Sequence, residues 1–136
     1  MNKFKLAFVS TLLIAGVAQA NTPCDNFEVK VTNDLAEPLN LKNGASLNAG
    51  LISPNTPLVL GSKQQHIFTI SGTSDKPMDG ELVYTTQSQP NKTVVLRFVL
   101  TNKHLHCHHR DTSPVSDYSV SNQRFPGSID YSIINR

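Results

Sequence analysis

The chain of 136 residues is short enough for one domain around a single core, and it carries 12 basic against 10 acidic side chains. The excess positive charge belongs to Lys3 and Lys5 at the N-terminus, so the rest of the chain is balanced. Without a basic stripe, the composition argues against nucleic acid as a partner. It also gives no electrostatic reason to expect an anionic membrane as one.

The first twenty residues have the three parts of a cleaved secretory signal. Lys3 and Lys5 precede an apolar run over 6–17, and Ala18-Gln19-Ala20 supplies a small-x-small cleavage site. The run is too short to span a bilayer comfortably. We therefore expect a signal peptide at 1–20, one mature domain at 21–136, export to the periplasm or the outside, and no integral membrane segment.

Short segments in which apolar and polar residues alternate follow one another along the mature chain, bounded by turn residues. The predicted strands are 27–33, 38–44, 58–60, 65–71, 81–86, 93–100, a short one around Tyr118 and Val120, and 128–134. Loops or turns are predicted by composition at 72–80, 101–103 and 122–127. No window has a sustained helical period.

The inward positions of these strands predict one hydrophobic core. It consists of Phe27, Val29, Val31, Phe68, Ile70, Leu82, Tyr84, Val94, Leu96, Phe98, Leu100, Tyr118, Val120, Ile129, Tyr131 and Ile133. Seven or eight short strands at this spacing are typical of an antiparallel β-sandwich or a closed barrel. We expect an all-β, single-domain β-sandwich.

Two cysteines, Cys24 and Cys107, remain after removal of the signal. An exported chain enters an oxidising compartment, where an even number of cysteines favours pairing. A Cys24–Cys107 disulfide is therefore expected. The alternative is a free Cys107 thiolate that acts as a nucleophile or a metal ligand.

The segment 103–110, KHLHCHHR, concentrates four of the five histidines around Cys107. If the strand alternation of 93–100 continued unbroken, His104, His106 and His108 would share one face, and His109 would lie on the other with Cys107. Alternate strand residues are close enough for two imidazoles to bind one zinc or copper ion. Against this, 101–103 looks like a turn, and Asp111 is the nearest carboxylate that could orient an imidazole. Protonation of the histidines at acidic pH would make this segment the most cationic part of the chain.

Other candidates for chemistry are fewer. His66 shares its face with Phe68 and Ile70, which favours a core or rim histidine over a remote third metal ligand. No nucleophile elbow, phosphate-binding glycine loop or His-Glu-x-x-His motif is present, so we expect no enzyme. A small hydrolase with His104 or His106 as base is the open alternative. Asn91 begins a glycosylation sequon, which matters only in a cell that uses it.

The order of elements resembles that of aegerolysins and related haemolysin-type, actinoporin-like proteins. The resemblance covers about 27–134 and lies in VKVTND, PLNL, HIFTI, GELVY, VVLRFVL, a Tyr-x-Val strand and DYSII. It implies a secreted β-sandwich that binds membrane lipids. The chain departs from that group in having no tryptophan for an interfacial aromatic cluster.

The sequence therefore predicts an exported, disulfide-stapled β-sandwich that works as a binding module, directed at a lipid, another surface or a protein. Its binding edge is expected in loops 44–57, 72–80 and 101–116, because loops on a rigid sandwich collect recognition residues. The alternatives are an exported zinc- or copper-binding protein that uses His104, His106, His108 and His109, and the small hydrolase.

Overall fold

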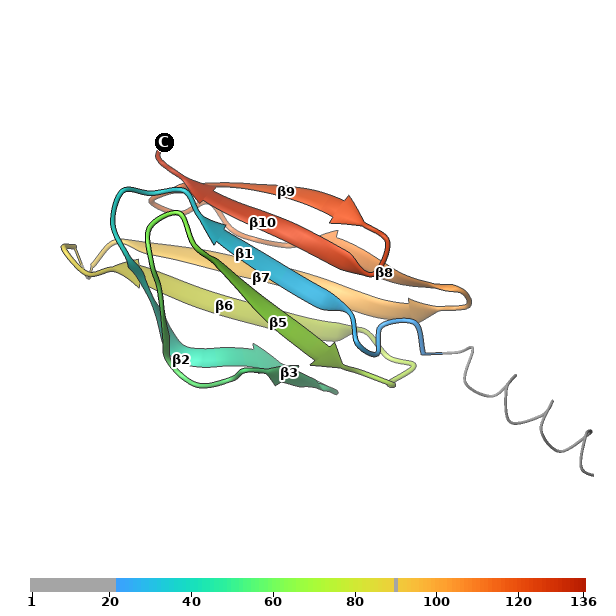
Figure 1. Ribbon diagram of the computed structural model, residues 1–136. Coiled ribbons are helices and arrows are strands. Elements are labelled where there is room, and N and C mark those ends of the chain that lie inside the picture. Colours follow the sequence, from blue (N-terminus) through green and yellow to red (C-terminus); the bar gives the residue numbers. More distant parts are fainter. Residues whose placement is uncertain (1–21, 90) are drawn as a thin grey trace, which may run out of the picture.

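The computed structural model describes residues 22–89 and 91–136, and these form two five-stranded sheets packed face to face (Figure 1). The predicted signal peptide, 1–20, lies outside the described residues. The strands are β1 (Glu28–Asn33), β2 (Leu39–Leu47), β3 (Leu51–Ser53), β4 (Leu58–Leu60), β5 (Gln65–Ser71), β6 (Met78–Thr86), β7 (Thr93–Lys103), β8 (His106–Asp111), β9 (Ser119–Phe125) and β10 (Ser128–Ile134). The expected all-β sandwich is confirmed.

The strand order is β3-β5-β1-β10-β9 in one sheet, called sheet A here, and β4-β2-β6-β7-β8 in the other, sheet B. The pairs are antiparallel except for β1 and β10, which run parallel at the centre of sheet A. The chain crosses from sheet B to sheet A between β2 and β3 and returns with β4. The first and last strands of the sandwich are therefore neighbours in the middle of one sheet.

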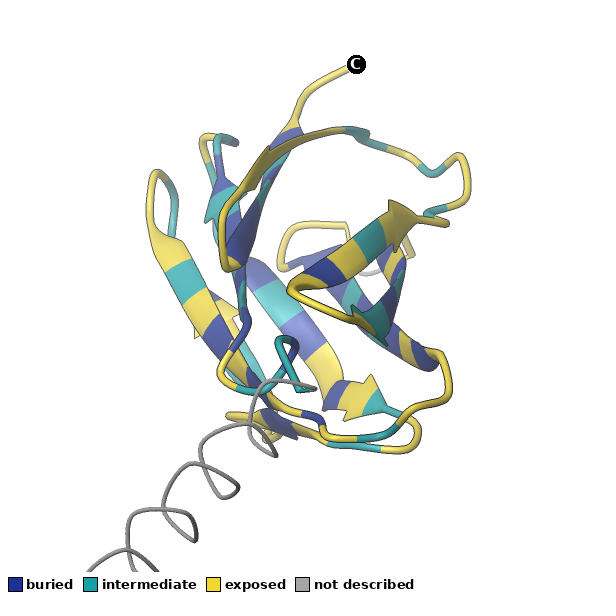
Figure 2. Ribbon diagram, turned by 90° about the vertical axis from the view of Figure 1, so that its right-hand side faces the viewer, coloured by how far each residue is buried: buried dark blue, intermediate teal, exposed yellow. Residues whose placement is uncertain are grey.

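The core lies between the sheets, on the inward face of each alternating strand (Figure 2). All the predicted core residues are buried except Tyr118 and Val120, which pack against the core at its margin. The core also contains Leu39 and Leu41 on β2, Leu60 on β4 and Met78 on β6, together with Cys24, Leu35, Ala45, Ile52 and Cys107. Leu39, Leu41 and Leu60 lie in predicted strands but are not among the predicted core residues, and Met78 lies in the predicted loop 72–80.

Several predicted loops are in fact strands. β6 begins at Met78 inside the predicted loop 72–80, because residues 78–80 pair with 98–100 of β7. At Gly80 the missing side chain leaves room for the Phe98 ring, which an added Cβ would strike. The polar composition of this segment favours a loop, but pairing with a central strand overrides that local preference.

Two predicted turns, 101–103 before the histidines and 122–127 after them, are also largely strand. β7 continues through the predicted turn 101–103 and pairs with β8, and the real turn is His104-Leu105, where His104 has φ 35°. β9 continues to Phe125, through most of the predicted turn 122–127, because it pairs along β10. Edge strands need only one partner, so their sequences carry a weaker signal than the alternating central strands.

Each of the four edge strands, β3 and β9 in sheet A and β4 and β8 in sheet B, has a feature that discourages pairing with another chain. β3 and β4 have only three residues each. β8 and β9 are longer, but their register turns His109 and Arg124 toward the interior side, opposite Leu100 and Ile129. Short edges and inward polar groups are common devices against edge-to-edge aggregation. They also concentrate polar side chains where β8 and β9 border the core.

Two asparagines hold the loops at opposite ends of the sandwich. Asn33, fully buried, donates through Nδ2 to the carbonyls of Glu37 (2.8 Å) and Leu60 (3.1 Å), and its Oδ1 accepts from the Leu35 amide (2.9 Å). Asn102 donates to the carbonyls of Gly72 and Ser74, at 3.2 and 2.8 Å. Each amide satisfies backbone groups that no strand partner reaches.

Candidate functional site

The disulfide joins the N-terminal segment to the segment of histidines. Cys24 and Cys107 are bonded, with their Cα atoms 4.6 Å apart, and both are buried. Asn102, which pairs with Cys107 between β7 and β8, accepts a hydrogen bond of 2.7 Å from the Cys24 amide. The predicted disulfide is confirmed, and Cys107 is therefore not a free thiolate.

The segment 103–110, called the histidine hairpin here, divides its imidazoles among three environments. His106 and His108 lie exposed on the outer face of β8, with ring centroids 6.4 Å apart. His104 lies in the turn, so it does not share their face as an unbroken strand would require. His109 faces inward with Cys107, as predicted.

The structure thus brings together two of the four predicted metal ligands. Within the part of the chain that the structure describes, no three His, Cys, Asp or Glu side chains are grouped so that they could hold a metal ion. His66 lies at the first half of β5, opposite Val31, with its ring against Phe68 at 6.0 Å. Burial lowers its pKa, with a weaker opposing effect from the Val59 backbone. His66 lies near the start of β5, whereas Asn102 of β7 contacts the carbonyl of Gly72, just past the other end of that strand.

His109 forms a polar chain with Tyr131 and Asp111 behind the hairpin. In this series of hydrogen bonds, His109 Nε2–H donates to the Tyr131 oxygen at 2.8 Å, and the Tyr131 O–H donates to Asp111 Oδ1 at 3.3 Å. Burial raises the pKa of Tyr131, and Asp111 adds to that rise. Asp111 thus orients His109 through a tyrosine, without direct contact between carboxylate and imidazole.

Burial, the charge of Arg124 and, to a lesser degree, His108 lower the pKa of His109 from 6.5 to about 4, against an opposing effect of Asp111. In the unfolded chain the imidazole takes up a proton near pH 6.5, whereas in the folded chain it stays neutral to about pH 4. The unfolded state therefore binds more protons across this window, and stability falls as the pH drops from about 6.5 to about 4.

We expect His109→Gln to flatten this pH dependence by about 1–2 kcal/mol between pH 6.5 and 4, after allowing for the partial exposure of the ring. The measurement is the free energy of unfolding in urea at a series of pH values. His106→Gln, on the outer face of the same strand, is the matched control and should leave the slope as in the wild type. Equal slopes for His109→Gln and the wild type would contradict the assignment.

Arg124 bridges the border between β8 and β9. Its Nη2 donates to the Cys107 carbonyl at 2.6 Å and its Nη1 to the Ser128 carbonyl at 2.8 Å, while the guanidinium lies 4.7 Å from the centre of the Phe27 ring. Among the described residues the ion pairs are Lys30–Glu28 and Arg97–Glu81, so no carboxylate pairs with Arg124. Sequence reasoning missed this residue, because it placed Arg124 in a turn.

A pocket of about 420 Å³ opens beside this guanidinium, and we call it the hairpin pocket. It is lined by His106, Cys107, His108, His109, Arg124, Phe125 and Pro126. The lining contains imidazoles, one guanidinium and an apolar rim, but no acidic side chain.

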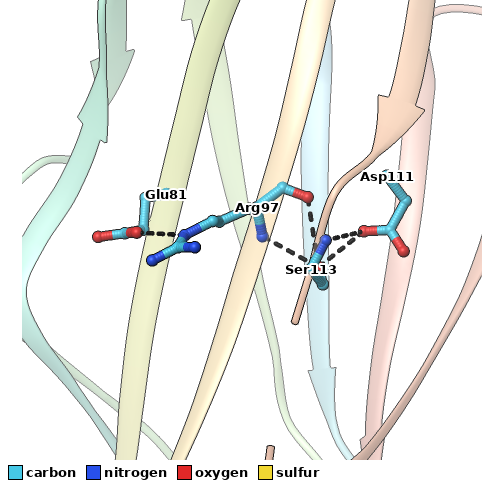
Figure 3. A network of polar contacts seen from close by, with 4 residues as sticks. All are labelled: Glu81, Arg97, Asp111 and Ser113. Atoms are coloured by element: carbon cyan, nitrogen blue, oxygen red, sulfur yellow. Dashed lines mark hydrogen bonds and ion pairs between the residues drawn. The ribbon is translucent and has the colours of Figure 1, made fainter. Parts of the chain in front are cut away.

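A larger pocket of about 560 Å³ lies on the outer face of sheet B, beside the network drawn in Figure 3. There Arg97 Nε donates to Glu81 Oε2 at 2.6 Å. The Arg97 amide donates to Ser113 Oγ at 2.9 Å, and Ser113 Oγ–H donates to Asp111 Oδ1 at 2.7 Å (Figure 3). Arg97 and Glu81 neutralise each other, and the hydrogen bonds of residues 112–113 with Arg97 and Asp111 fasten this segment along β7. We read the network as structural despite the larger volume of the pocket.

The predicted binding loops are only partly together. Residues 48–50, 72–77 and 104–105 are turns at the end of the sandwich that also holds the disulfide, at the right in Figure 1. Residues 54–57 pass Gly44 along the side of sheet B. Residues 112–117 run along β7 toward the other end, with the Asp117 amide bonded to the Thr93 carbonyl. The turn 126–127 belongs to the disulfide end and was not among the predicted binding loops.

The fold and this end of the molecule define a disulfide-stapled β-sandwich with an acid-free pocket beside an edge strand. No family model matches the chain, and no curated protein matches it. Among solved structures the chain is similar to IP-1A from Alcaligenes faecalis, with a TM-score of 0.57 and 11% identity over 85% of this chain and 94% of that one. That likeness shows the fold alone. The aegerolysin resemblance, the metal site and the hydrolase stay predictions.

The described residues contain no helix that is long and apolar enough to cross a membrane.

Proposed function

We propose that this chain is an exported binding module that attaches to an anionic surface through the disulfide end of the sandwich. One observation carries the proposal. At the disulfide end of the sandwich, exposed apolar side chains lie beside pockets that are lined by cationic side chains and by no acidic ones. The overall charge is balanced, so the attraction is local to this end.

The apolar part of this surface comes from the tip of the histidine hairpin and from the end of β9. Leu105, at the tip of the histidine hairpin, is 83% exposed, and Phe125, beside the hairpin pocket, is 38% exposed. Large apolar side chains at an exposed tip bury little in the domain itself, and where they gather beside polar groups they mark interaction sites. Phe125 takes the role that a tryptophan would have on a lipid-binding face.

The charged part lies on both sides of the histidine hairpin. The hairpin pocket holds Arg124, and a second pocket of about 230 Å³ on the outer face is lined by Pro77, Val99, Thr101, Lys103, His108 and Arg110. Neither lining includes Asp or Glu. Cations that line pockets without acidic side chains attract phosphate or carboxylate groups on a surface.

Export is supported by the disulfide. A buried Cys24–Cys107 bond is compatible with an oxidising compartment, and the proposed signal peptide supplies the route there. The rigid attachment of the hairpin to the N-terminal segment also keeps the tip residues in one orientation, which lowers the entropy cost of binding.

The test is cosedimentation of the untagged protein, expressed as the full chain and purified from the exported fraction. Its partners are vesicles of phosphatidylcholine, vesicles of phosphatidylcholine with an equal amount of phosphatidylglycerol, and purified peptidoglycan sacculi. We expect binding to at least one anionic surface, none to phosphatidylcholine alone, and loss of at least tenfold in affinity for Leu105→Asp/Phe125→Asp, equivalent to about 1.4 kcal/mol.

The matched control is Val59→Asp/Ile67→Asp, which adds the same two negative charges at exposed apolar positions on β4 and β5, 56% and 47% exposed. It should bind as the wild type does. Absence of binding to both anionic surfaces, or equal losses in the tip variant and the control, would contradict the proposed function.

A further inference from the structure

We propose that the hairpin pocket is a binding site for a single anionic group, a carboxylate or a phosphate, with Arg124 as the residue that holds it. The inference rests on the proposed function in placing that group on a surface. The pocket itself is defined by geometry alone and is tested with soluble anions.

Arg124 is held in place without being neutralised. Two of its N–H groups donate to the carbonyls of Cys107 and Ser128, and the Phe27 ring supports its plane. A guanidinium has five N–H donors, so donors remain for a third acceptor. Neutral carbonyls orient the charge but do not cancel it, and no carboxylate among the described residues forms an ion pair with Arg124.

The rest of the lining fits an anion with a small organic body. His106 and His108, on the exposed face of β8, have imidazoles that can donate hydrogen bonds, whereas the single N–H of neutral His109 is donated to Tyr131. Phe125 and Pro126 form an apolar rim. The volume of about 420 Å³ is within the range of small-molecule sites. A guanidinium beside such a rim recognises planar carboxylate and tetrahedral phosphate groups by paired hydrogen bonds.

The same features disfavour a metal ion in this pocket. A divalent cation bound by His106 and His108 would lie beside the positive charge of Arg124, which the lining does not offset with any carboxylate. Like charges in a partly buried site repel more strongly than in water. An anion is attracted by the group that repels the metal.

The first experiment titrates the exported, untagged protein with glycerol phosphate and, separately, with succinate, followed by backbone amide shifts in nuclear magnetic resonance. Sodium chloride at matched ionic strength is the blank, because exposed charges more than about 8 Å apart are screened at 0.15 M salt. We expect saturable shifts at His106–His109 and Arg124, with a Kd of about 1 mM or tighter for at least one anion. The stronger anion identifies the source as a phosphate or a carboxylate.

Arg124→Gln should weaken this binding at least tenfold, whereas Arg97→Gln, which removes an arginine already paired with Glu81, should leave it unchanged. Arg124 also supports the fold, so a second measurement uses the wild-type protein only. Phenylglyoxal modification is followed residue by residue in mass spectrometry. The bound anion should slow modification of Arg124 several-fold and leave Arg97 unaffected.

Shifts that do not saturate, or that equal those in chloride, would overturn the proposal. So would equal protection of both arginines. The experiments distinguish the two proposals. If the protein binds soluble anions but neither vesicles nor sacculi, the proposed function is refuted and the anion site stands. If Arg124→Gln still binds the surface, and the wild type shows no saturable shifts with soluble anions, the anion site is refuted and the proposed function stands.

Discussion

Replacement of both cysteines, in Cys24→Ala/Cys107→Ala, should lower the free energy of unfolding by about 4.5 kcal/mol, the chain-entropy value for a bridge across 83 residues. A domain of this size has a total stability of about 5–15 kcal/mol, so the variant should melt far below the wild type. Alanine is the better replacement, because Cys24 is fully buried and a serine hydroxyl there would add its own penalty.

The measurement is chemical denaturation of the oxidised wild type, the reduced wild type and the variant. Reduction should bring the wild type to the stability of the variant and leave the variant unchanged, which separates the loss of the bridge from any packing defect. Two free thiols in the denatured, unreduced wild type would show that the bridge does not form in the purified protein.

Asn33→Ala is expected to cost about 3 kcal/mol or more. The substitution leaves the buried Leu35 amide and Leu60 carbonyl, and the partly buried Glu37 carbonyl, without their partner. Each unpaired buried polar group costs roughly 1–3 kcal/mol, and an alanine returns little by burial.

The effect is measured by urea denaturation beside Asn122→Ala, an exposed position on β9 that should change the free energy of unfolding by less than about 0.5 kcal/mol. A loss below about 1 kcal/mol for Asn33→Ala would mean that water enters the end of the sandwich and replaces the amide.

The sequence predicted the central strands well because both of their faces are constrained. In 93–100, Val94, Leu96 and Phe98 must reach the core while Arg97 must reach water, and only a strand satisfies both. The disulfide was also predicted correctly, because each of the two cysteines left after the predicted signal has only the other as a possible partner within the chain.

The edge strands were harder to predict. β8 reads as a run of histidines with no apolar alternation, and its strand form depends on pairing with β7. Arg124 was hidden for a related reason: the polar residues around it favour a turn, and its inward position follows only from its register with Ile129. Asn33 has the composition of a turn residue, and nothing local distinguishes an exposed turn amide from a buried one.

The central pairing of β1 with β10 has a consequence for the order of folding. Val29 lies opposite Ile129, so the first strand lacks one neighbour until the last strand has been synthesised. Contacts between such distant positions slow folding, since a long loop must close before they form. An N-terminal fragment therefore lacks β9 and β10 of sheet A. Its Cys24 cannot form the disulfide until the histidine hairpin with Cys107 has been synthesised. Sheet A is therefore completed only when the last strand of the sequence is available, and it cannot assemble from the N-terminus onward.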